Sequence, residues 1–291
     1  MKKILFLINQ LVEKEIPAGF ARLVNREIDR QQFEPDFFYS EYPGHCTEMV
    51  KSMFEDYDVF VAVGGDGTVN EVAQPLINTG KSMAIIPAGS GNGLARTLDI
   101  PLHSGKAVRL INEGRMKTID TGTINGRPFI HMAGLGFAAE VARCYAQKGN
   151  HGLTHYVSHV IRTFLDYKPA EYTIRIDNRE YTGSYFLLDF ANVSQWGYNA
   201  HIAPGADPTD GKLNLAMLSP FPKIMIPVPA LRLFLKTMDR CRFMQTELIR
   251  EANIPRTGES RAHIDGDPVL LEGDIQVRIL PASLNVISGR E

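Results

Sequence analysis

Residues 59–72, VFVAVGGDGTVNEV, decide the fold and carry the clearest chemistry of the chain. An unbroken apolar run ends in three glycines within four positions, and helix-forming residues follow. A buried strand, a tight loop and a helix start give this order. Glycine lets a backbone approach a ligand, and loop amides at a helix start bind anions. Asp66 lies inside this loop, where it would repel a phosphate, so it indicates a cation or a proton-transfer step.

A second glycine-rich loop follows the next predicted strand, residues 83–86. It spans residues 87–96, PAGSGNGLAR, and carries Ser90 and Asn92 between its glycines. Hydroxyl and amide groups on a flexible loop suit phosphate or ribose oxygens. Two such loops on adjacent strands are a much stronger signal than one, and neither is a P-loop, because the lysine is missing. Simpler interpretations stay open: Asn92 as a turn residue in the left-handed region, and Asp66 as a helix N-cap.

The first 120 residues alternate between strand and helix patterns. Strands are predicted at residues 3–8, 37–39, 59–63 and 83–86, and helices at residues 19–28 and 46–54 and through residue 77. This alternation predicts a parallel sheet with right-handed crossover helices, in a Rossmann-like three-layer α/β domain. Ligands of such sheets bind at the carboxyl ends of the strands, where both glycine loops lie.

A different pattern begins after about residue 115. Strands separated by turn signals are predicted at residues 117–123, 128–132, 172–176, 181–192, 213–218, 261–264, 275–280 and 284–287, with helices at 137–146 and 153–167. Short strands with turns between them are typical of an antiparallel β-sandwich. We therefore predict two domains, residues 1–120 and 121–291, with the last few residues packing back on the first domain.

The two loops together resemble the diacylglycerol kinase catalytic-domain family, which includes bacterial lipid kinases, ceramide kinases and sphingosine kinases. The resemblance continues at residues 134–141 (GLGFAAEV), 203–213 (APGADPTDGKL) and 264–268 (IDGDP), in the family's order over nearly the whole chain. It implies an NAD-kinase/diacylglycerol-kinase-like fold with the active site in the cleft between an α/β domain and a β-sandwich domain. The PAGSGN form of the second loop is more similar to the sphingosine-kinase branch.

The resemblance also implies a set of site residues, with ATP and Mg²⁺ as cofactors. Asp267 is the implied proton acceptor, and Asp66 holds Mg²⁺ through water. Asp210 would bind a structural Mg²⁺ through its carboxylate, and Asp207 and Lys212 through their backbone carbonyls, which are ligands that hard cations prefer. The implied nucleotide contacts are Ser40, Gly64, Gly65, Asp66, Gly67, Thr68, Val69, Asn70, Glu71, Gly89, Ser90, Gly91 and Asn92.

The sequence departs from the family's pattern at two places. The family usually has Asn-Pro-x-x-Gly after the first strand, but here Asn9 is followed by Gln10, and the next glycine is Gly19. The family's base is the Glu of Asp-Gly-Glu, whereas this chain has Asp267, one methylene shorter. A base must come within about 2.6–3.2 Å of the attacking hydroxyl. These departures keep a catalytically impaired nucleotide-binding regulatory protein as an alternative to an ATP-dependent lipid kinase; NAD kinase activity is a weaker alternative.

Composition limits the partners and the compartment. The net charge of −2 gives the chain as a whole no attraction for nucleic acid. Three cysteines, Cys46, Cys144 and Cys241, show no metal-binding spacing and fit a reducing cytosol. Residues 223–242 mix basic and apolar side chains, which indicates either a core helix or a membrane-docking segment. We expect ATP, a lipid substrate (diacylglycerol, a sphingoid base or a related lipid) and a transient membrane surface as partners. The expected location is the cytoplasm, peripheral at the inner membrane surface, and a homodimer is an open alternative to a monomer.

Overall fold

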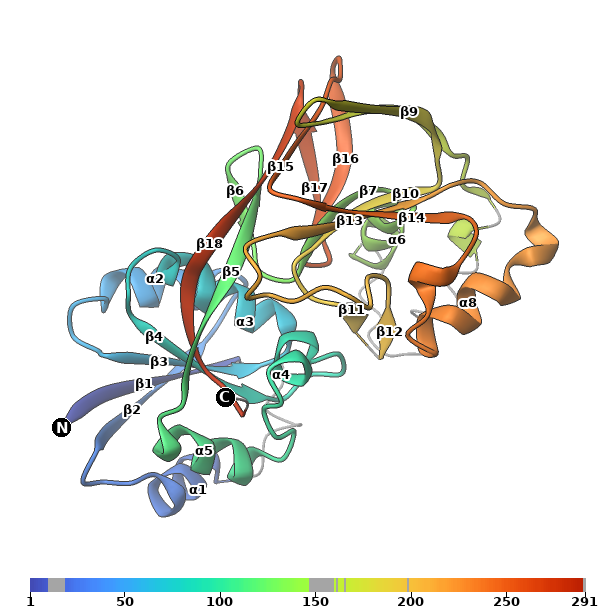
Figure 1. Cartoon of the computed structure of the whole chain (residues 1–291). Coiled ribbons are helices and arrows are strands. Elements are labelled where there is room, and N and C mark those ends of the chain that lie inside the picture. Colours follow the sequence, from blue (N-terminus) through green and yellow to red (C-terminus); the bar gives the residue numbers. More distant parts are fainter. Residues whose placement is uncertain (10–18, 147–159, 161, 165, 198, 290–291) are drawn as a thin grey trace. The chain divides into compact units, whose positions relative to one another are not determined.

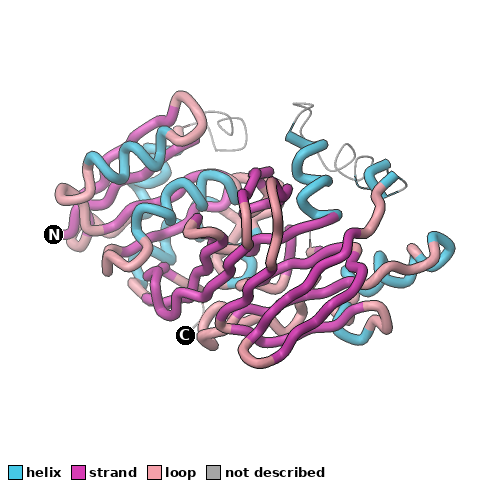
Figure 2. Tube along the Cα trace, turned by 90° about the horizontal axis from the view of Figure 1, so that it is seen from above, coloured by secondary structure: helices cyan, strands magenta, loops and turns pink. Residues whose placement is uncertain are grey.

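A computed structural model describes residues 1–9, 19–146, 160, 162–164, 166–197 and 199–289 (Figures 1 and 2). The chain divides into two compact units: the N-terminal unit, Met1–Ile119 with Ala282–Glu291, and the C-terminal unit, Asp120–Pro281. Most of the helix predicted at residues 153–167, and the segment after Asn9, lie outside the described residues.

The N-terminal unit contains a parallel sheet with the strand order β2-β1-β3-β4-β18. All six residues of β3 are buried, which explains why its sequence is an apolar run without alternation. In chain order the elements are β1 (Lys2–Asn9), α1 (Phe20–Glu27), β2 (Phe33–Ser40), α2 (His45–Ser52), β3 (Val59–Gly64), α3 (Asp66–Ala73), η2 (Gln74–Leu76), β4 (Ser82–Pro87), α4 (Gly93–Thr97) and α5 (Ser104–Glu113), followed much later by the end of β18 (Ile275–Ile287).

The helices of this unit cover both faces of the sheet. Helices α1 and α5 pack together on one face, and α2 and α3 pack together on the other (Figure 1). The register aligns the strand ends, because Asn9 pairs with Ser40 and Gly64 pairs with Pro87. The predicted three-layer α/β arrangement is confirmed, and the carboxyl ends of four strands form one edge.

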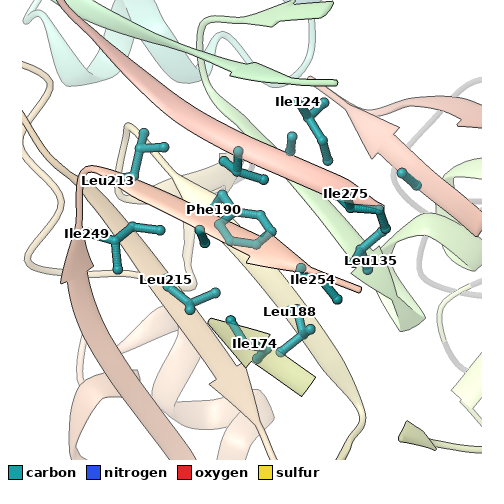
Figure 3. Packing of buried hydrophobic residues seen from close by; sticks show 14 of the residues in the cluster. Ile124, Leu135, Ile174, Leu188, Phe190, Leu213, Leu215, Ile249, Ile254 and Ile275 are labelled. Carbon is teal, nitrogen blue, oxygen red and sulfur yellow. The ribbon is translucent and has the colours of Figure 1, made fainter. Parts of the chain in front are cut away.

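The C-terminal unit is an antiparallel β-sandwich, as predicted. One sheet has the order β14-β13-β10-β7-β16-β17, and the other contains β15, β8, β9, the first part of β18, and the β5–β6 hairpin. Buried apolar side chains from both sheets, including Phe190 and Ile275, form the core between them (Figure 3). The elements are β5 (Met116–Ile124), β6 (Arg127–Phe129), β7 (Met132–Gly136), α6 (Phe137–Ala146), β8 (Ala170–Ile176), β9 (Arg179–Tyr185), β10 (Leu187–Ala191), β11 (Gln195–Gly197), β12 (Ala200–His201), β13 (Leu213–Leu218), η3 (Lys223–Met225), α8 (Pro227–Phe234), η4 (Met238–Arg240), β14 (Met244–Ile249), β15 (Glu251–Ile254), β16 (Glu259–Ile264), β17 (Asp267–Glu272) and β18.

The structure corrects two strand predictions. Residues 181–192 do not form one strand: β9 ends at Tyr185, β10 begins at Leu187, and the two belong to different sheets. The apolar run hides this crossing, because β10 is buried at every position and shows no alternation. Residues 275–280 and 284–287 belong to the single strand β18, since Pro281 and the positive φ of Ala282 do not end it.

Candidate active site

The two glycine loops lie against each other at the carboxyl edge of the N-terminal sheet. The amide of Ala88 donates a hydrogen bond to the carbonyl of Gly64 at 2.9 Å. A Cβ added to Gly89 would lie 2.4 Å from the Cα of Gly65. Because this approach is between backbones, only glycine fits at position 89 without moving the partner loop. The predicted juxtaposition of the loops is therefore real, and it depends on direct backbone contact.

Asp66 connects the first loop to the second. It is the first residue of α3, and its Oδ1 accepts a hydrogen bond from the amide of Gly93, the first residue of α4, at 2.7 Å. The N-cap of α3 is Gly65, with no side-chain capping bond, so the N-cap interpretation of Asp66 is wrong. This hydrogen bond is one reason for an aspartate in the first loop, because it fixes the position of the second loop. Its role toward Mg²⁺ stays a prediction.

Within the second loop, Asn92 organises the backbone. It is the N-cap of α4 with φ of 53°, its Oδ1 accepts from the amide of Gly89 at 3.1 Å, and its Nδ2 donates to the Gly89 carbonyl. The interpretation of Asn92 as a turn residue in the left-handed region is therefore confirmed, and its side chain closes the turn through both bonds to Gly89. Ser90 is exposed at the tip of the same loop.

The other predicted nucleotide contacts fall into two groups. Thr68 is buried beneath the first loop and accepts a hydrogen bond from Nδ2 of Asn9 at 3.1 Å, and buried Ser40 pairs with Asn9 at the strand ends. These residues lie at the same sheet edge as the glycine loops. Val69 and Asn70 are buried along α3, and Oδ1 of Asn70 accepts a hydrogen bond from Nε2 of Gln74, so their contacts with the nucleotide stay predictions.

Glu71 binds the neighbouring helix. Its carboxylate accepts hydrogen bonds from the amides of Gly44, at 2.8 Å, and Cys46, at 3.2 Å, at the start of α2. A carboxylate at a helix N-terminus is favoured by the helix dipole. Burial, with Glu71 close by, raises the pKa of the Cys46 thiol to about 11. Glu71 therefore has a structural role, and its contact with the nucleotide stays a prediction.

In the C-terminal unit, the Asp265-Gly266 turn presents Asp267 to solvent. Ile264 pairs with Asp267 across a two-residue turn in which Asp265 and Gly266 both have positive φ, of 50° and 93°. This is the hairpin turn that Asp-Gly favours. Asp267 begins β17 and is exposed. A general base needs this accessibility.

The carboxylate of Asp265 ties this turn to the rest of the unit. It accepts hydrogen bonds from the amides of Ile130 and His131, both at 2.8 Å, and Met132, at 2.9 Å. The Asp265 amide returns a bond to the carbonyl of Met132 at 2.9 Å. The Asp265 carboxylate thus fixes the hairpin, whereas Asp267 is exposed to solvent.

The predicted metal loop is built of local turns. Oδ1 of Asp207 accepts from the Thr209 amide at 3.0 Å, and Oδ1 of Asp210 accepts from the Lys212 amide at 2.9 Å. Sequence reasoning missed buried Asp120, whose Oδ2 accepts from the amide of Gly211 at 2.7 Å. Its place in β5 gave no sign of a partner 91 residues away.

This loop fits the donor chemistry of a hard cation without a dense ligand cluster. Among the described residues, no group of three or more His, Cys, Asp or Glu side chains could hold a metal ion. Mg²⁺ needs only one or two carboxylates when carbonyls, waters or phosphates complete its shell. Oδ2 of Asp210 lies outside the hydrogen bond that closes its own turn, so Asp210 can offer one carboxylate oxygen.

A buried polar group on the outer face of the six-stranded sheet was also missed. Asp189 is fully buried, and its two oxygens contact Nε2 of His263 at 3.1 Å and Nε1 of Trp196 at 2.7 Å. A Cβ at Gly134 would lie 1.8 Å from Asp189 Oδ1, so the missing side chain makes room for this pair. In the sequence, Asp189 interrupts an apolar run, and this interruption was the one signal that could have indicated a buried polar pair.

The C-terminal unit also has a cavity of about 460 Å³, lined by residues including Tyr167, Tyr172, Arg256 and Arg261. The cavity is lined by Arg261 and Leu270, which pair with each other in the β16–β17 hairpin. The Asp265-Gly266 turn lies three residues further along β16, where Ile264 pairs with Asp267. The cavity therefore lies toward the opposite end of the β16–β17 hairpin from Asp267.

Family comparison agrees with both halves of this arrangement. Residues 3–124 match the model of the diacylglycerol kinase catalytic domain, and residues 132–288 match the model of the YegS C-terminal NAD kinase beta sandwich-like domain. The chain belongs to the family of this YegS C-terminal domain, whose model covers more than half of it, and its N-terminal residues match the diacylglycerol kinase catalytic domain. Its fold places the family's two glycine loops and its Asp-Gly-acid turn in separate compact units.

Curated relatives of this family are distant in sequence. A diacylglycerol kinase of Bacillus subtilis is 27% identical over 224 residues, covering 75% of this chain and 74% of that protein. An uncharacterized protein of Synechocystis is 28% identical over 237 residues, covering 78% of this chain. The chain spans 54% of the length of that cyanobacterial relative.

Solved structures carry the same fold. A diacylglycerol kinase from Bacillus anthracis aligns with a TM-score of 0.74 at 17% identity, covering 99% of this chain and 97% of that chain. An NAD kinase from Archaeoglobus fulgidus, in complex with ATP, aligns with a TM-score of 0.57 at 13% identity, covering 100% and 94%. At these identities the likeness concerns the fold alone.

Proposed function

We propose that this protein is a lipid kinase that transfers the γ-phosphate of ATP to a lipid hydroxyl with the help of Mg²⁺. The observation that carries the proposal is the pair of glycine loops pressed together at Gly65 and Gly89 and joined by Asp66 to the start of α4. A phosphate chain bound along these loops would meet many backbone amides. Family membership supports the same conclusion.

On the donor side, the chain's contribution is positioning. Phosphoryl transfer depends mainly on alignment and on neutralising charge. Backbone amides of the two loops would hold the phosphates, and exposed Ser90 would donate a hydroxyl. Asp66 holds the loops in register, so any change that separates them should lower the transfer rate.

On the acceptor side, Asp267 would take the proton of the attacking hydroxyl. Its exposure and its place beside a turn fixed by Asp265 support this role. The bonds from three backbone amides to Asp265 fix the end of the hairpin at which Asp267 begins β17. Magnesium, when bound to the ATP phosphates, would neutralise their charge, and Asp66 would hold it through water. A separate structural magnesium would be held by the carboxylate of Asp210 and the backbone carbonyls of Asp207 and Lys212.

Diacylglycerol is the first acceptor to test, because a relative is named a diacylglycerol kinase. A sphingoid base is the second, from the form of the PAGSGN loop. We also propose that the protein works in the cytoplasm, peripherally at the inner membrane surface. Its three cysteines are free, which fits a reducing compartment. Among the described residues, no helix has the length and apolar character needed to cross a bilayer.

Two other functions remain as alternatives. A catalytically impaired nucleotide-binding regulator is motivated by Asp267 in place of the usual glutamate. NAD kinase activity is motivated only by the fold.

One experiment separates the three. The purified chain is incubated with γ-labelled ATP, Mg²⁺ and micelles of diacylglycerol, a sphingoid base or total lipid extract, and in parallel with NAD. Label in a lipid that depends on Asp66 and Asp267 supports the kinase. ATP binding without transfer to any lipid would favour the regulator, and labelled NADP would favour the NAD kinase.

A further inference from the structure

Residues 221–243, the α8 segment, present apolar side chains to solvent. Five of the twelve exposed large apolar side chains among the described residues lie here: Ile224, Val228, Leu231, Phe234 and Leu235. Ile224 is 87% exposed, and Leu231 and Leu235 are about 60% exposed. This concentration on one short segment is unlike scattered surface leucines and marks an interaction surface.

The apolar side chains follow a helical stripe. Val228 and Leu231 lie in α8, Leu235 is its C-cap residue and Ile224 lies in the preceding η3; their spacing by four, three and four residues is that of one helix face. In a core helix this face would be buried. Here Pro229 is the one buried residue of α8, so the stripe points away from the unit and the core-helix interpretation is wrong.

Basic side chains are interspersed with the stripe along the sequence. Residues 221–243 contain Lys223, Arg232, Lys236, Arg240 and Arg242, and Asp239 is their one acidic residue. Five positive charges less one negative charge leave a segment charge of +4 on a chain whose net charge is −2. Lys236, Arg240 and Arg242 are exposed. Each cation near an anionic bilayer adds to binding.

The segment is fixed to its unit while its apolar face is free to dock. Met238 and Cys241 are buried just beyond α8, and α8 contacts β12, η3 and η4. Figure 1 shows α8 beyond the strands of the C-terminal unit. The stripe is thus held on a folded base, which lowers the ordering cost of binding.

We propose that the α8 segment docks on an anionic phospholipid surface, inserting the Ile224–Leu235 stripe between the headgroups while the surrounding cations contact lipid phosphates. A second copy of the chain fits poorly, because a symmetric contact would bring two segments of charge +4 together. This inference deepens the proposed function, since a lipid kinase needs its acceptor in a membrane, but docking is measured without ATP or phosphate transfer.

The test is sedimentation of the full chain with vesicles of phosphatidylcholine alone, or of phosphatidylcholine mixed with phosphatidylglycerol, whose anionic headgroups give the surface a negative potential. Two double variants remove each part of the surface: Leu231→Ser with Phe234→Ser, and Lys236→Glu with Arg240→Glu. The matched control is Leu248→Ser, which changes a leucine of β14 that is 50% exposed.

We expect binding to the anionic vesicles only, weakened about tenfold or more by either double variant and unchanged by L248S. High salt should reproduce the effect of the charge variant. Absence of vesicle binding, or binding that both double variants retain, overturns the proposal. So does a wild-type dimer, measured by light scattering, that L231S/F234S converts to a monomer. The phosphorylation of diacylglycerol in micelles is measured on the same variants. Lost vesicle binding with unchanged phosphorylation is a loss of docking alone, whereas a wild type without phosphorylation is a failure of the proposed kinase function.

Discussion

Replacing Gly89 with alanine tests the backbone contact between the two glycine loops. The added Cβ would lie 2.4 Å from the Gly65 Cα, and ordinary contact begins at 3.4 Å, so the loops must part by about 1 Å (3.4 − 2.4). Both clashing groups belong to backbone, so no side chain can rotate away. Overpacking of this kind costs about 1–3 kcal/mol of folding free energy. A misplacement of about 1 Å can also cost about 100-fold in rate.

We expect G89A to lower the melting temperature of the full chain and to weaken ATP binding about tenfold or more, measured by circular dichroism and calorimetry. The matched stability control is Gly67→Ala, because a Cβ at that exposed helical position meets nothing within 4 Å. This control should keep or slightly raise the melting temperature. If G89A melts with the wild type and binds ATP equally well, the loops do not press together as described.

The remaining predictions concern the hairpin and a buried thiol. Asp265→Asn should lower the free energy of unfolding by about 2 kcal/mol, because it weakens bonds from three backbone amides to a charged acceptor; exposed Asp267→Asn should stay within about 0.5 kcal/mol of the wild type in urea unfolding. Equal losses in both variants would contradict the division of roles. Burial raises the pKa of Cys46 to about 11, so its alkylation, followed by mass spectrometry, should be slow at pH 8 and speed up toward pH 11. The same shift stabilises the folded state below pH 9, where the thiol is neutral in both states, and this contribution is lost as the pH rises toward 11. Rapid labelling of folded protein at pH 8 would refute the burial argument.

Local sequence was enough for the strands and loops of the N-terminal unit. The apolar run ending at Gly64 has no alternation because both faces of β3 are buried, and the glycines follow where the backbone turns. The helical spacing of the stripe containing Leu231 was also readable. Its direction was not, because periodicity predicts a shared face without saying whether that face is covered.

Long-range partners could not be read from the sequence. Glu71 was interpreted as a nucleotide contact, yet its carboxylate bonds the Gly44 amide, 27 residues earlier in the chain. Asp265 was read only as part of residues 264–268, IDGDP, but its three amide donors come from residues more than 130 positions away. The Asp189–His263 contact joins two strands that are separated by β7 in the sheet. Such pairs arise from the topology of the sheets, which residue patterns do not encode locally.

The central claim is transfer of phosphate from ATP to a lipid hydroxyl with Asp267 as the proton acceptor. The most direct measurement is the initial rate of labelled lipid formation by the wild type, Asp267→Asn and Asp267→Glu with diacylglycerol in mixed micelles. We predict that D267N loses about 100-fold or more in kcat with little change in KM for ATP, and that D267E retains activity. Equal rates for the wild type and D267N would contradict the claim.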